Sequence, residues 1–399
     1  MFSKEDVMSY VQEEDVKFIR LAFCDICGTP KNIAIMPSEL NRAFTEGIPF
    51  ETQNIKGFTN YVKSTLFLHP DPSTLSILPW RPQSGRVVRM FCDVSYPDGT
   101  PFIADGRQIL KNAVAAAEEK GITCQFSAYS EFYLFKTDED GKSTYEPYDT
   151  AGYFDIAPED KGENVRREIC FTLEDMGIHP ESSHHEAGPS QHEIDFVYDE
   201  PLSAAENVIT YMSVVRTVAM RYGLAADFMP KPLKEHSGNG MHINIKVHSK
   251  DGQDMLMPFM AGVLKHIKEM TFFLNPVEES YQRFGEKRAP IYITWSPENR
   301  SQLIMVPEVS ESRRHMKLRS PDACTNPYLA FALLIYAGLD GIDKNLDPGE
   351  PTNMDLLSQD AGMKREFNKL PLSLKEARYE AQESDFIASI VGEDYPYHI

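Results

Sequence analysis

The spacing of hydrophobic and polar residues divides the chain into two regions. Residues 17–95 contain short alternating or apolar runs, such as VKFIRLAF and VVRMFCDV, which proline and glycine separate. This pattern predicts a small sheet-rich domain over 1–103, with YPDGTPFIAD (96–105) as the boundary segment. Over 104–399, long alternating strands and amphipathic helices follow one another irregularly, which favours an α+β fold over a doubly wound α/β fold.

Helix signals are strongest in the second region. SAAENVITYMSVVRTVAMRYG begins with a capping-box pattern of Ser203 and Glu206, and NPYLAFALLIYAGLDG begins with Asn326 at the N-cap position and Pro327 after it. The apolar stretch YLAFALLIYAGL (328–339) is too short to span a bilayer, so we expect a buried helix there.

Composition narrows the class of protein. The 399 residues are enough for a large core, and 60 Asp and Glu against 40 Lys and Arg give a formal net charge of −20. Such an acidic chain is a poor nonspecific binder of nucleic acid, and its polar, acidic N-terminus is unlike a secretory signal. Six cysteines do not make a disulfide scaffold, which favours a reducing compartment. We expect a cytoplasmic globular protein without nucleic-acid or membrane partners.

Three glutamates lie in strand-like segments and are candidate metal ligands. Glu131 belongs to SEFYLF, and Glu186 and Glu193 flank the turn of a predicted hairpin over 181–196. Buried carboxylates need a counter-cation, and three of them suit a hard divalent ion such as Mg²⁺ or Mn²⁺. The spacing alone leaves open that they are three unrelated, exposed glutamates.

Two further segments place polar side chains on one face of a strand. They are HSGNGMHINIKV (236–247), which contains a glycine-rich turn, and SRRHMKLRSPD (312–322). A period of two collects these residues on the polar faces: His242, Asn244 and Lys246 in the first segment, and Arg313, His315, Lys317 and Arg319 in the second. Adjacent cations are costly unless they meet solvent or anions, so the second face is expected either at the surface or in an anion-binding site.

Long motifs along the chain resemble those of bacterial type I glutamine synthetases. In order, they are SEFYLF, SSHHEAGPSQHEIDF, FMPKP, SGNGMHINI, APIYITWSPENRS and LRSPDACTNPYLAFALLIYAGLDGI. The resemblance covers nearly the whole chain and implies an N-terminal β-grasp domain (1–103) and a C-terminal glutamine synthetase/guanido kinase-like catalytic domain (104–399) with a curved antiparallel sheet. It also implies a homo-oligomeric ring with sites between neighbouring subunits, in which glutamate and ATP meet at two metal ions.

Most of the family's site residues have counterparts in this sequence. By the resemblance, Glu131, Glu186 and Glu193 form one complete metal position. The counterparts at other binding positions are Gly238, His242, Arg283 and Arg319 for the substrate, Arg300 for phosphate, and Glu181, Asn244 and Lys246 on the nucleotide side. Glu51 stands for the aspartate that the family links to ammonium binding.

The second metal position departs from the family. His242 remains, but Tyr129 and Lys317 stand where the family has glutamates, and neither a phenol nor an ammonium binds Mg²⁺ as a carboxylate does. We therefore expect a single Mg²⁺ or Mn²⁺ and doubt the use of ATP. Further departures are Met305 and His315 for arginines, Asn244 and Lys246 for a histidine and a serine, and Arg288 for a glutamate.

The residues leave three hypotheses of function open. The first is a protein that binds a glutamate-like or γ-glutamyl compound beside one divalent ion, with its ATP-dependent ligase chemistry altered or lost. Glu51, Arg300 and Lys317 then serve the chemistry, with Lys317 either acting as base or nucleophile without ATP or pairing with Glu131 in place of the lost ion. The second is a functional ATP-dependent ligase of glutamate with ammonia or another amine. The third is a non-catalytic binding or regulatory homologue.

Overall fold

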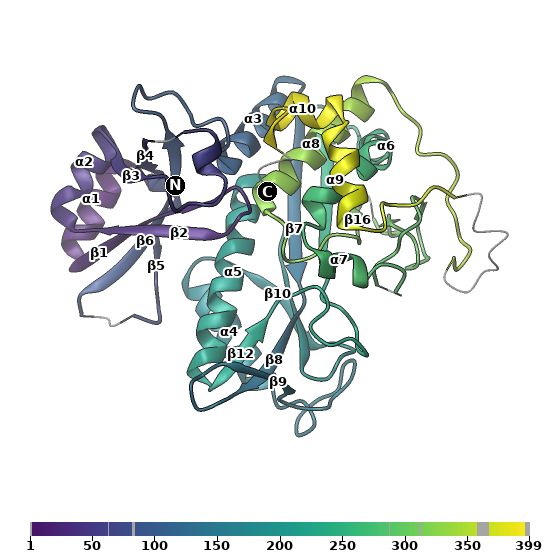
Figure 1. Cartoon of the computed structure of the whole chain (residues 1–399), viewed down its shortest axis with the longest axis horizontal. Coiled ribbons are helices and arrows are strands. Elements are labelled where there is room, and N and C mark those ends of the chain that lie inside the picture. Colours follow the sequence, from purple (N-terminus) through teal and green to yellow (C-terminus); the bar gives the residue numbers. More distant parts are fainter. Residues whose placement is uncertain are drawn as a thin grey trace.

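The computed structural model describes residues 2–62, 64–81, 84–286, 288–310, 313–356 and 367–395. Two regions lie next to each other, the N-terminal one around α1 and α2 and the second one around the remaining helices (Figure 1). Among the described helices, we find none with the length and apolar character needed to cross a membrane.

The N-terminal region is a six-stranded sheet with the order β2-β1-β6-β4-β3, in which β5 pairs with β6. Its strands are β1 (Val16–Cys24), β2 (Pro30–Ile35), β3 (Ile48–Glu51), β4 (Thr65–Pro70), β5 (Ser76–Ile77) and β6 (Arg86–Ser95). Its helices are α1 (Lys4–Glu13) and α2 (Leu40–Thr45), with the short 3-10 helices η1 (Pro37–Glu39), η2 (Phe58–Asn60) and η3 (Pro72–Thr74). β1 and β6 run parallel, and the other pairs are antiparallel. This arrangement agrees with the β-grasp domain that the resemblance implies.

The second region contains two five-stranded sheets that meet at Glu131. One has the order β10-β11-β8-β12 with β9 paired to β8, and the other has the order β14-β15-β16-β13-β7. The strands are β7 (Ile122–Ser130), β8 (Phe132–Thr137), β9 (Ser143–Pro147), β10 (Pro180–His185), β11 (Gln191–Phe196), β12 (Leu224–Asp227), β13 (Met241–Ser249), β14 (Trp295–Ser296), β15 (Ile304–Met305) and β16 (Met316–Leu318). Glu131 is the single residue between β7 and β8, so the chain passes from one sheet to the other at this carboxylate.

The helices of the second region include the buried helix that the apolar stretch predicts. They are α3 (Gly106–Glu119), α4 (Glu163–Asp175), α5 (Pro201–Arg221), α6 (Leu256–Leu274), α7 (Glu278–Gln282), α8 (Pro327–Asp343), α9 (Leu374–Gln382) and α10 (Asp385–Val391). At the start of α8, the Asn326 side chain accepts a hydrogen bond from the Tyr328 N–H at 3.1 Å, as the N-cap pattern predicts. α8 packs so closely against α6 that a Cβ on Gly262 or Gly341 would collide with the backbone of the other helix.

The start of α5 corrects the capping-box prediction. The helix begins at Pro201, with Glu200 as its N-cap residue, so Ser203 and Glu206 both lie inside it. Glu206 accepts a hydrogen bond from the buried Arg107 instead. A buried guanidinium needs carboxylate partners, and satisfying it outweighs the smaller gain from a helix cap.

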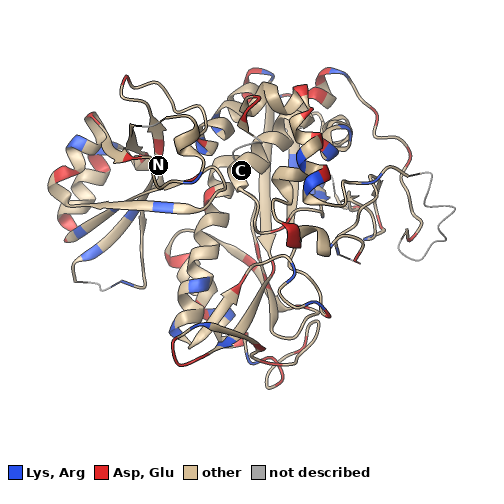
Figure 2. Cartoon of the chain, in the orientation of Figure 1, with Lys and Arg blue, Asp and Glu red and all other residues tan. Residues whose placement is uncertain are grey.

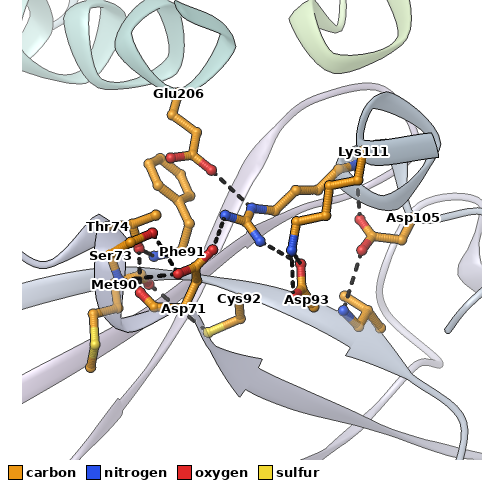
Figure 3. A network of polar contacts seen from close by, with 12 residues as sticks. Asp71, Ser73, Thr74, Met90, Phe91, Cys92, Asp93, Asp105, Lys111 and Glu206 are labelled. Carbon is orange, nitrogen blue, oxygen red and sulfur yellow. Dashed lines mark hydrogen bonds and ion pairs between the residues drawn. The ribbon is translucent and has the colours of Figure 1, made fainter. Parts of the chain in front are cut away.

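That arginine joins the two regions. Arg107 is 2% exposed, and its guanidinium donates to Asp71 at 2.8 Å, to Glu206 at 2.8 Å and to Asp93 (Figure 3). Lys111 also donates to Asp93, at 2.7 Å. Asp71 and Asp93 belong to the N-terminal region, whereas the two cations lie on α3 and Glu206 lies on α5. The network therefore crosses the boundary predicted from the sequence, and the domain division itself stays a prediction.

Replacing Arg107 by methionine is expected to lower the free energy of unfolding by about 3–5 kcal/mol, because it leaves three carboxylates without their shared counter-cation. Urea denaturation followed by circular dichroism measures this change. The matched control is Lys120→Met, which removes an exposed ion pair with Asp343 and is expected to cost less than about 1 kcal/mol. Equal effects of the two substitutions would show that the network does not hold the regions together.

Candidate functional site

Most of the sequence-predicted site residues line one large cleft in the second region. Its volume is about 1430 Å³, and its walls come from β7, β10, β11, β13 and β16 and from the segment 299–309. The predicted residues among its lining are Glu181, Glu186, Glu193, His242, Asn244, Lys246, Arg300, Lys317 and Arg319. A smaller pocket of about 310 Å³ is lined in part by Gly238 and Arg283. Glu51 lies on β3 in the other region and lines neither cavity.

The three predicted glutamates form a carboxylate cluster at the cleft. Glu131, Glu186 and Glu193 are all buried. The Glu131 side chain accepts a hydrogen bond from the Gly240 N–H at 2.8 Å. In the β10–β11 hairpin Glu193 pairs with His184, and Glu186 follows where the strand ends, so both carboxylates lie near the turn as predicted. The cluster is therefore assembled from the junction of the two sheets and from one hairpin.

A buried network supports the hairpin turn. Asp149 Oδ1 accepts a hydrogen bond from the Ser190 N–H at 3.0 Å and lies 3.0 Å from His185 Nε2. Ser190 adopts a left-handed backbone conformation with φ of 57°, which these bonds help to hold. Burial alone would raise the pKa of Asp149, but the hydrogen bond and charge of His185 lower this pKa to about 2. On β11, His192 Nδ1 lies 2.8 Å from the guanidinium of Arg166, which belongs to α4. These contacts position the two hairpin glutamates.

Arg288 brings positive charge to the carboxylate cluster. Its Nη1 lies 3.3 Å from Glu131 Oε1 and also pairs with Glu186, while its guanidinium lies over the Tyr153 ring, 5.0 Å from the ring centre. Burial alone would lower the pKa of Arg288, but Glu186 and Glu131 raise it above its usual value. The sequence shows this arginine as a departure from the family, but the contact itself joins residues 157 positions apart and has no local signal.

Lys317 and Tyr129 pack together where the resemblance places a second ion. Tyr129 on β7 pairs with His242 on β13, and Lys317 on β16 pairs with Asn244 of the same strand. Lys317 Nζ lies 4.6 Å from the centre of the Tyr129 ring, which is a cation–π contact. In the described part of the chain no ion pair joins Lys317 to Glu131. This corrects the hypothesis that Lys317 pairs with that glutamate.

Two cations, the half-buried Lys317 and the buried Arg319, face the cleft. Burial lowers the pKa of Lys317. The negative charge of Glu193 acts in the opposite direction, and the positive charge of Arg319 lowers the pKa further. Burial and the charges of Arg288 and Arg300 lower the pKa of Arg319 to about 10, so this guanidinium stays charged at neutral pH. Among the described residues, Arg319 Nη1 has no hydrogen-bond partner. A buried charged donor without a partner indicates a place for an anion.

Glu131, Glu193 and His242 fit a divalent cation. Their ligand atoms lie within 4.8 Å of one another, and Glu193 Oε2 and His242 Nε2 are buried without a partner among the described residues. Burial lowers the pKa of His242, so its imidazole is neutral and can act as a ligand. Burial and the nearby Glu131 raise the pKa of Glu193, a cost that a bound cation removes. Glu186 pairs with Arg288, as Glu131 does, so His242 and the predicted Glu186 are both candidates for the third ligand beside Glu131 and Glu193.

The residues predicted for the nucleotide side lie in the same cleft. Lys246 Nζ lies 4.1 Å from the centre of the Tyr198 ring, and Asn244 Oδ1 is buried without a partner among the described residues. Glu181 lies on β10, and Arg300 lies on the loop between β14 and β15. Cations, an amide and a carboxylate around one cavity can hold a polar, phosphate-bearing ligand. Their individual roles stay predictions.

Gly238 and Arg283 shape the smaller pocket. A Cβ on Gly238 would lie 2.5 Å from Arg283 Cγ, so only glycine lets this loop pass the arginine. Arg283 is buried and donates to the carbonyl oxygens of Ser320 at 3.2 Å and Pro321 at 3.4 Å, and it pairs with Asp322 at 3.5 Å. Its guanidinium is therefore already held by the protein. Binding of a substrate carboxylate by Arg283 stays a prediction.

Comparisons with known proteins agree with this arrangement. The family model of the glutamine synthetase β-Grasp domain matches residues 15–97, and that of the glutamine synthetase catalytic domain matches residues 103–398. The chain is 45% identical to a glutamine synthetase of Methanosarcina mazei, over 98% of this chain and 91% of that protein. It is 42% identical to a glutamine synthetase of Clostridium saccharobutylicum, over 98% of this chain and 92% of that protein.

Solved structures share the fold. A GmaS/ADP complex matches with a TM-score of 0.88 and 28% identity, over 98% of this chain and 93% of that one. Plasmodium falciparum glutamine synthetase matches with a TM-score of 0.87 over 100% and 94% of the two chains, and at 21% identity this likeness shows the fold alone. The predicted α+β fold with a β-grasp and a catalytic domain is confirmed. This chain belongs to the glutamine synthetase family.

Proposed function

We propose that this chain is an ATP-dependent carboxylate–amine ligase that joins a glutamate-like acid to ammonia or another amine. The observation that carries the proposal is a cation-binding set, Glu131, Glu193 and His242, at the same cleft as the unpartnered Arg319 guanidinium. Amide formation driven by phosphoryl transfer needs a divalent cation and the anionic groups of the substrates held side by side. Relatives named glutamine synthetase support this reaction class. They lend no support to the expectation that ATP is not used, so ATP-dependent ligation is the main proposal and an ATP-independent activity is not proposed.

The cleft residues divide the work of such a reaction. The three candidate ligands fit one Mg²⁺ or Mn²⁺, which when bound neutralises phosphate charge. Arg319 offers its free donor to a carboxylate or phosphate oxygen, and Arg300 and Lys317 add two further cations to the same cleft. The Lys317 ammonium is a single fixed charge and cannot bridge two phosphates as a divalent ion does. We therefore expect slow turnover with one ion per chain.

The proposal is tested by incubating the purified protein with L-glutamate, ATP, Mg²⁺ and ammonium or hydroxylamine. ADP and the amide product are expected in equal amounts, each dependent on every substrate. Glu193→Gln is expected to lower this rate by about 10²-fold, since it weakens electrostatic stabilisation at the phosphoryl group. The matched control is Glu146→Gln, because Glu146 is exposed, pairs with Lys136 and lies outside the cleft lining. ADP without amide, or no ADP with any amine, would contradict the proposal.

A second candidate is a homologue that binds a glutamate-like acid but has altered or lost phosphoryl transfer. The observation that favours it is Lys317 over the Tyr129 ring, with Met305 paired beside Lys317 on β15. By the resemblance, Tyr129 and Lys317 replace two ligands of a divalent ion and Met305 replaces an arginine, so we expect weaker neutralisation of the phosphate charge here. The ligase assay above separates the two candidates, and calorimetric titration with L-glutamate tests the acid binding that they share. Both bind the acid, but only the ligase also forms ADP and amide.

We also propose that the chain works as a homo-oligomeric ring in the cytoplasm. Glu51 lies on the exposed side of β3, away from both cavities of its own chain, so it could complete a site only in a neighbouring subunit. Light scattering that gives the mass of a monomer would contradict the ring. Figure 2 shows basic and acidic residues interspersed along the described helices and strands. With a net charge of −20, the absence of a nucleic-acid partner stays an expectation.

A further inference from the structure

Arg288 reaches from a surface turn onto two buried carboxylates. Its side chain is 30% exposed, whereas those of Glu131 and Glu186 are 1% and 2% exposed. The turn is closed by a hydrogen bond from the Gly285 N–H to the Ala289 carbonyl oxygen at 2.9 Å. Because the backbone is held and the guanidinium stands at the end of a long side chain, Arg288 can leave the carboxylates by rotation of that side chain alone.

Arg288 lies between the two cavities. Arg288 and Tyr153 line both the large cleft and the smaller pocket of about 310 Å³. The other charged residues of the smaller pocket are already paired: Arg283 is held by Asp322 and backbone oxygens, and Glu286 pairs with Lys231. Among the described residues that line this pocket, Arg288 is therefore the cation that pairs with candidate ligands of a divalent ion.

We propose that Arg288 is a built-in counter-cation that a divalent ion displaces from Glu131 and Glu186, after which its guanidinium binds an acidic group of the ligand in the smaller pocket. The inference rests on the proposed binding of one divalent ion and an acid at this site. A carboxylate oxygen cannot satisfy the ion and the guanidinium equally well, and a released guanidinium regains hydrogen bonds from a carboxylate of the ligand. Ion and acid then favour each other's binding.

Such coupling must be reciprocal. If the ion frees Arg288 for the acid, the acid strengthens ion binding by the same factor. Removing Arg288 has two separate consequences. The ion no longer has to break the ion pairs with Glu131 and Glu186, so it binds more tightly on its own. The acid loses the contact that depended on the ion, so the mutual enhancement disappears.

Mn²⁺ binding tests the proposal without turnover. Free Mn²⁺ is measured by electron paramagnetic resonance during titration of the full chain, with and without saturating L-glutamate. In the wild type, L-glutamate is expected to tighten Mn²⁺ binding about tenfold. Arg288→Gln is expected to bind Mn²⁺ alone about tenfold more tightly than the wild type, with an enhancement by L-glutamate below about twofold. The matched control Arg313→Gln removes the same charge from an exposed residue of the cleft and is expected to keep the wild-type enhancement.

The outcomes distinguish displacement of Arg288 by the ion from a general effect of the charge of Arg288. Tighter Mn²⁺ binding in Arg288→Gln with an unchanged enhancement by L-glutamate would overturn the proposal, since Arg288 would then act only through its field. An absence of enhancement in the wild type would overturn it as well, and this measurement needs no variant to fold. Failure of the ligase assay leaves these binding results unaffected, so the two proposals fail separately.

Discussion

The double variant Tyr129→Glu, Lys317→Glu is expected to bind one more divalent ion per chain than the wild type. Tyr129 lies opposite His242, and the Lys317 ammonium rests on the Tyr129 ring at 4.6 Å. The two substitutions replace a phenol and a cation by carboxylates that touch the same volume. With the His242 imidazole they complete a second set of ligands for a hard cation, and Glu131, Glu186 and Glu193 are then expected to hold the first ion.

Equilibrium dialysis against Mn²⁺ measures the number of ions bound. The matched control is Tyr129→Gln, Lys317→Gln, which has side chains of the same size without the charges and is expected to bind no additional ion. The carboxylate variant is also expected to raise the ATP-dependent rate by about 10²-fold, because a second divalent ion stabilises the transferred phosphoryl group. If dialysis finds no additional ion, Lys317 does not stand in the place of a metal.

Arg319→Gln is expected to weaken L-glutamate binding by about 10²–10³-fold. Arg319 is 4% exposed, and its Nη1 lacks a partner in the described part of the protein. A buried, charge-assisted hydrogen bond to a carboxylate contributes a few kcal/mol, and the glutamine amide carries no charge to replace it. The effect is therefore expected in the dissociation constant, which isothermal titration calorimetry measures directly.

Two comparison variants show which property of Arg319 matters. Arg319→Lys keeps the charge but loses the planar fork, and it is expected to weaken binding by about tenfold. Arg313→Gln removes an exposed charge from the same cleft and is expected to change the dissociation constant less than about threefold. Wild-type affinity in Arg319→Gln would assign the acid to another cation of the cleft.

Local patterns in the sequence were sufficient for several features. The turn in 181–196 predicts a hairpin, and the structure places Glu186 and Glu193 at that turn. The apolar stretch after Asn326 predicts the buried α8 with its N-cap. These features depend on hydrogen bonds and periodicities among residues that are close in the sequence. Their pattern can therefore be recognised from the sequence alone. Long ordered motifs were likewise sufficient for the family and for its two domain types.

Long-range packing decided the rest. The contact of Arg288 with Glu131 joins residues 157 positions apart, and a long arginine on a surface turn can point in many directions. Lys317 rests on Tyr129 instead of pairing with Glu131 because β7, β13 and β16 bring the ammonium over that ring. The start of α5 depends in the same way on Arg107, which draws Glu206 into the contact between the two regions. In each case the partner of a charge is set by which distant segments the folded chain brings together, and periodicity carries no information about that.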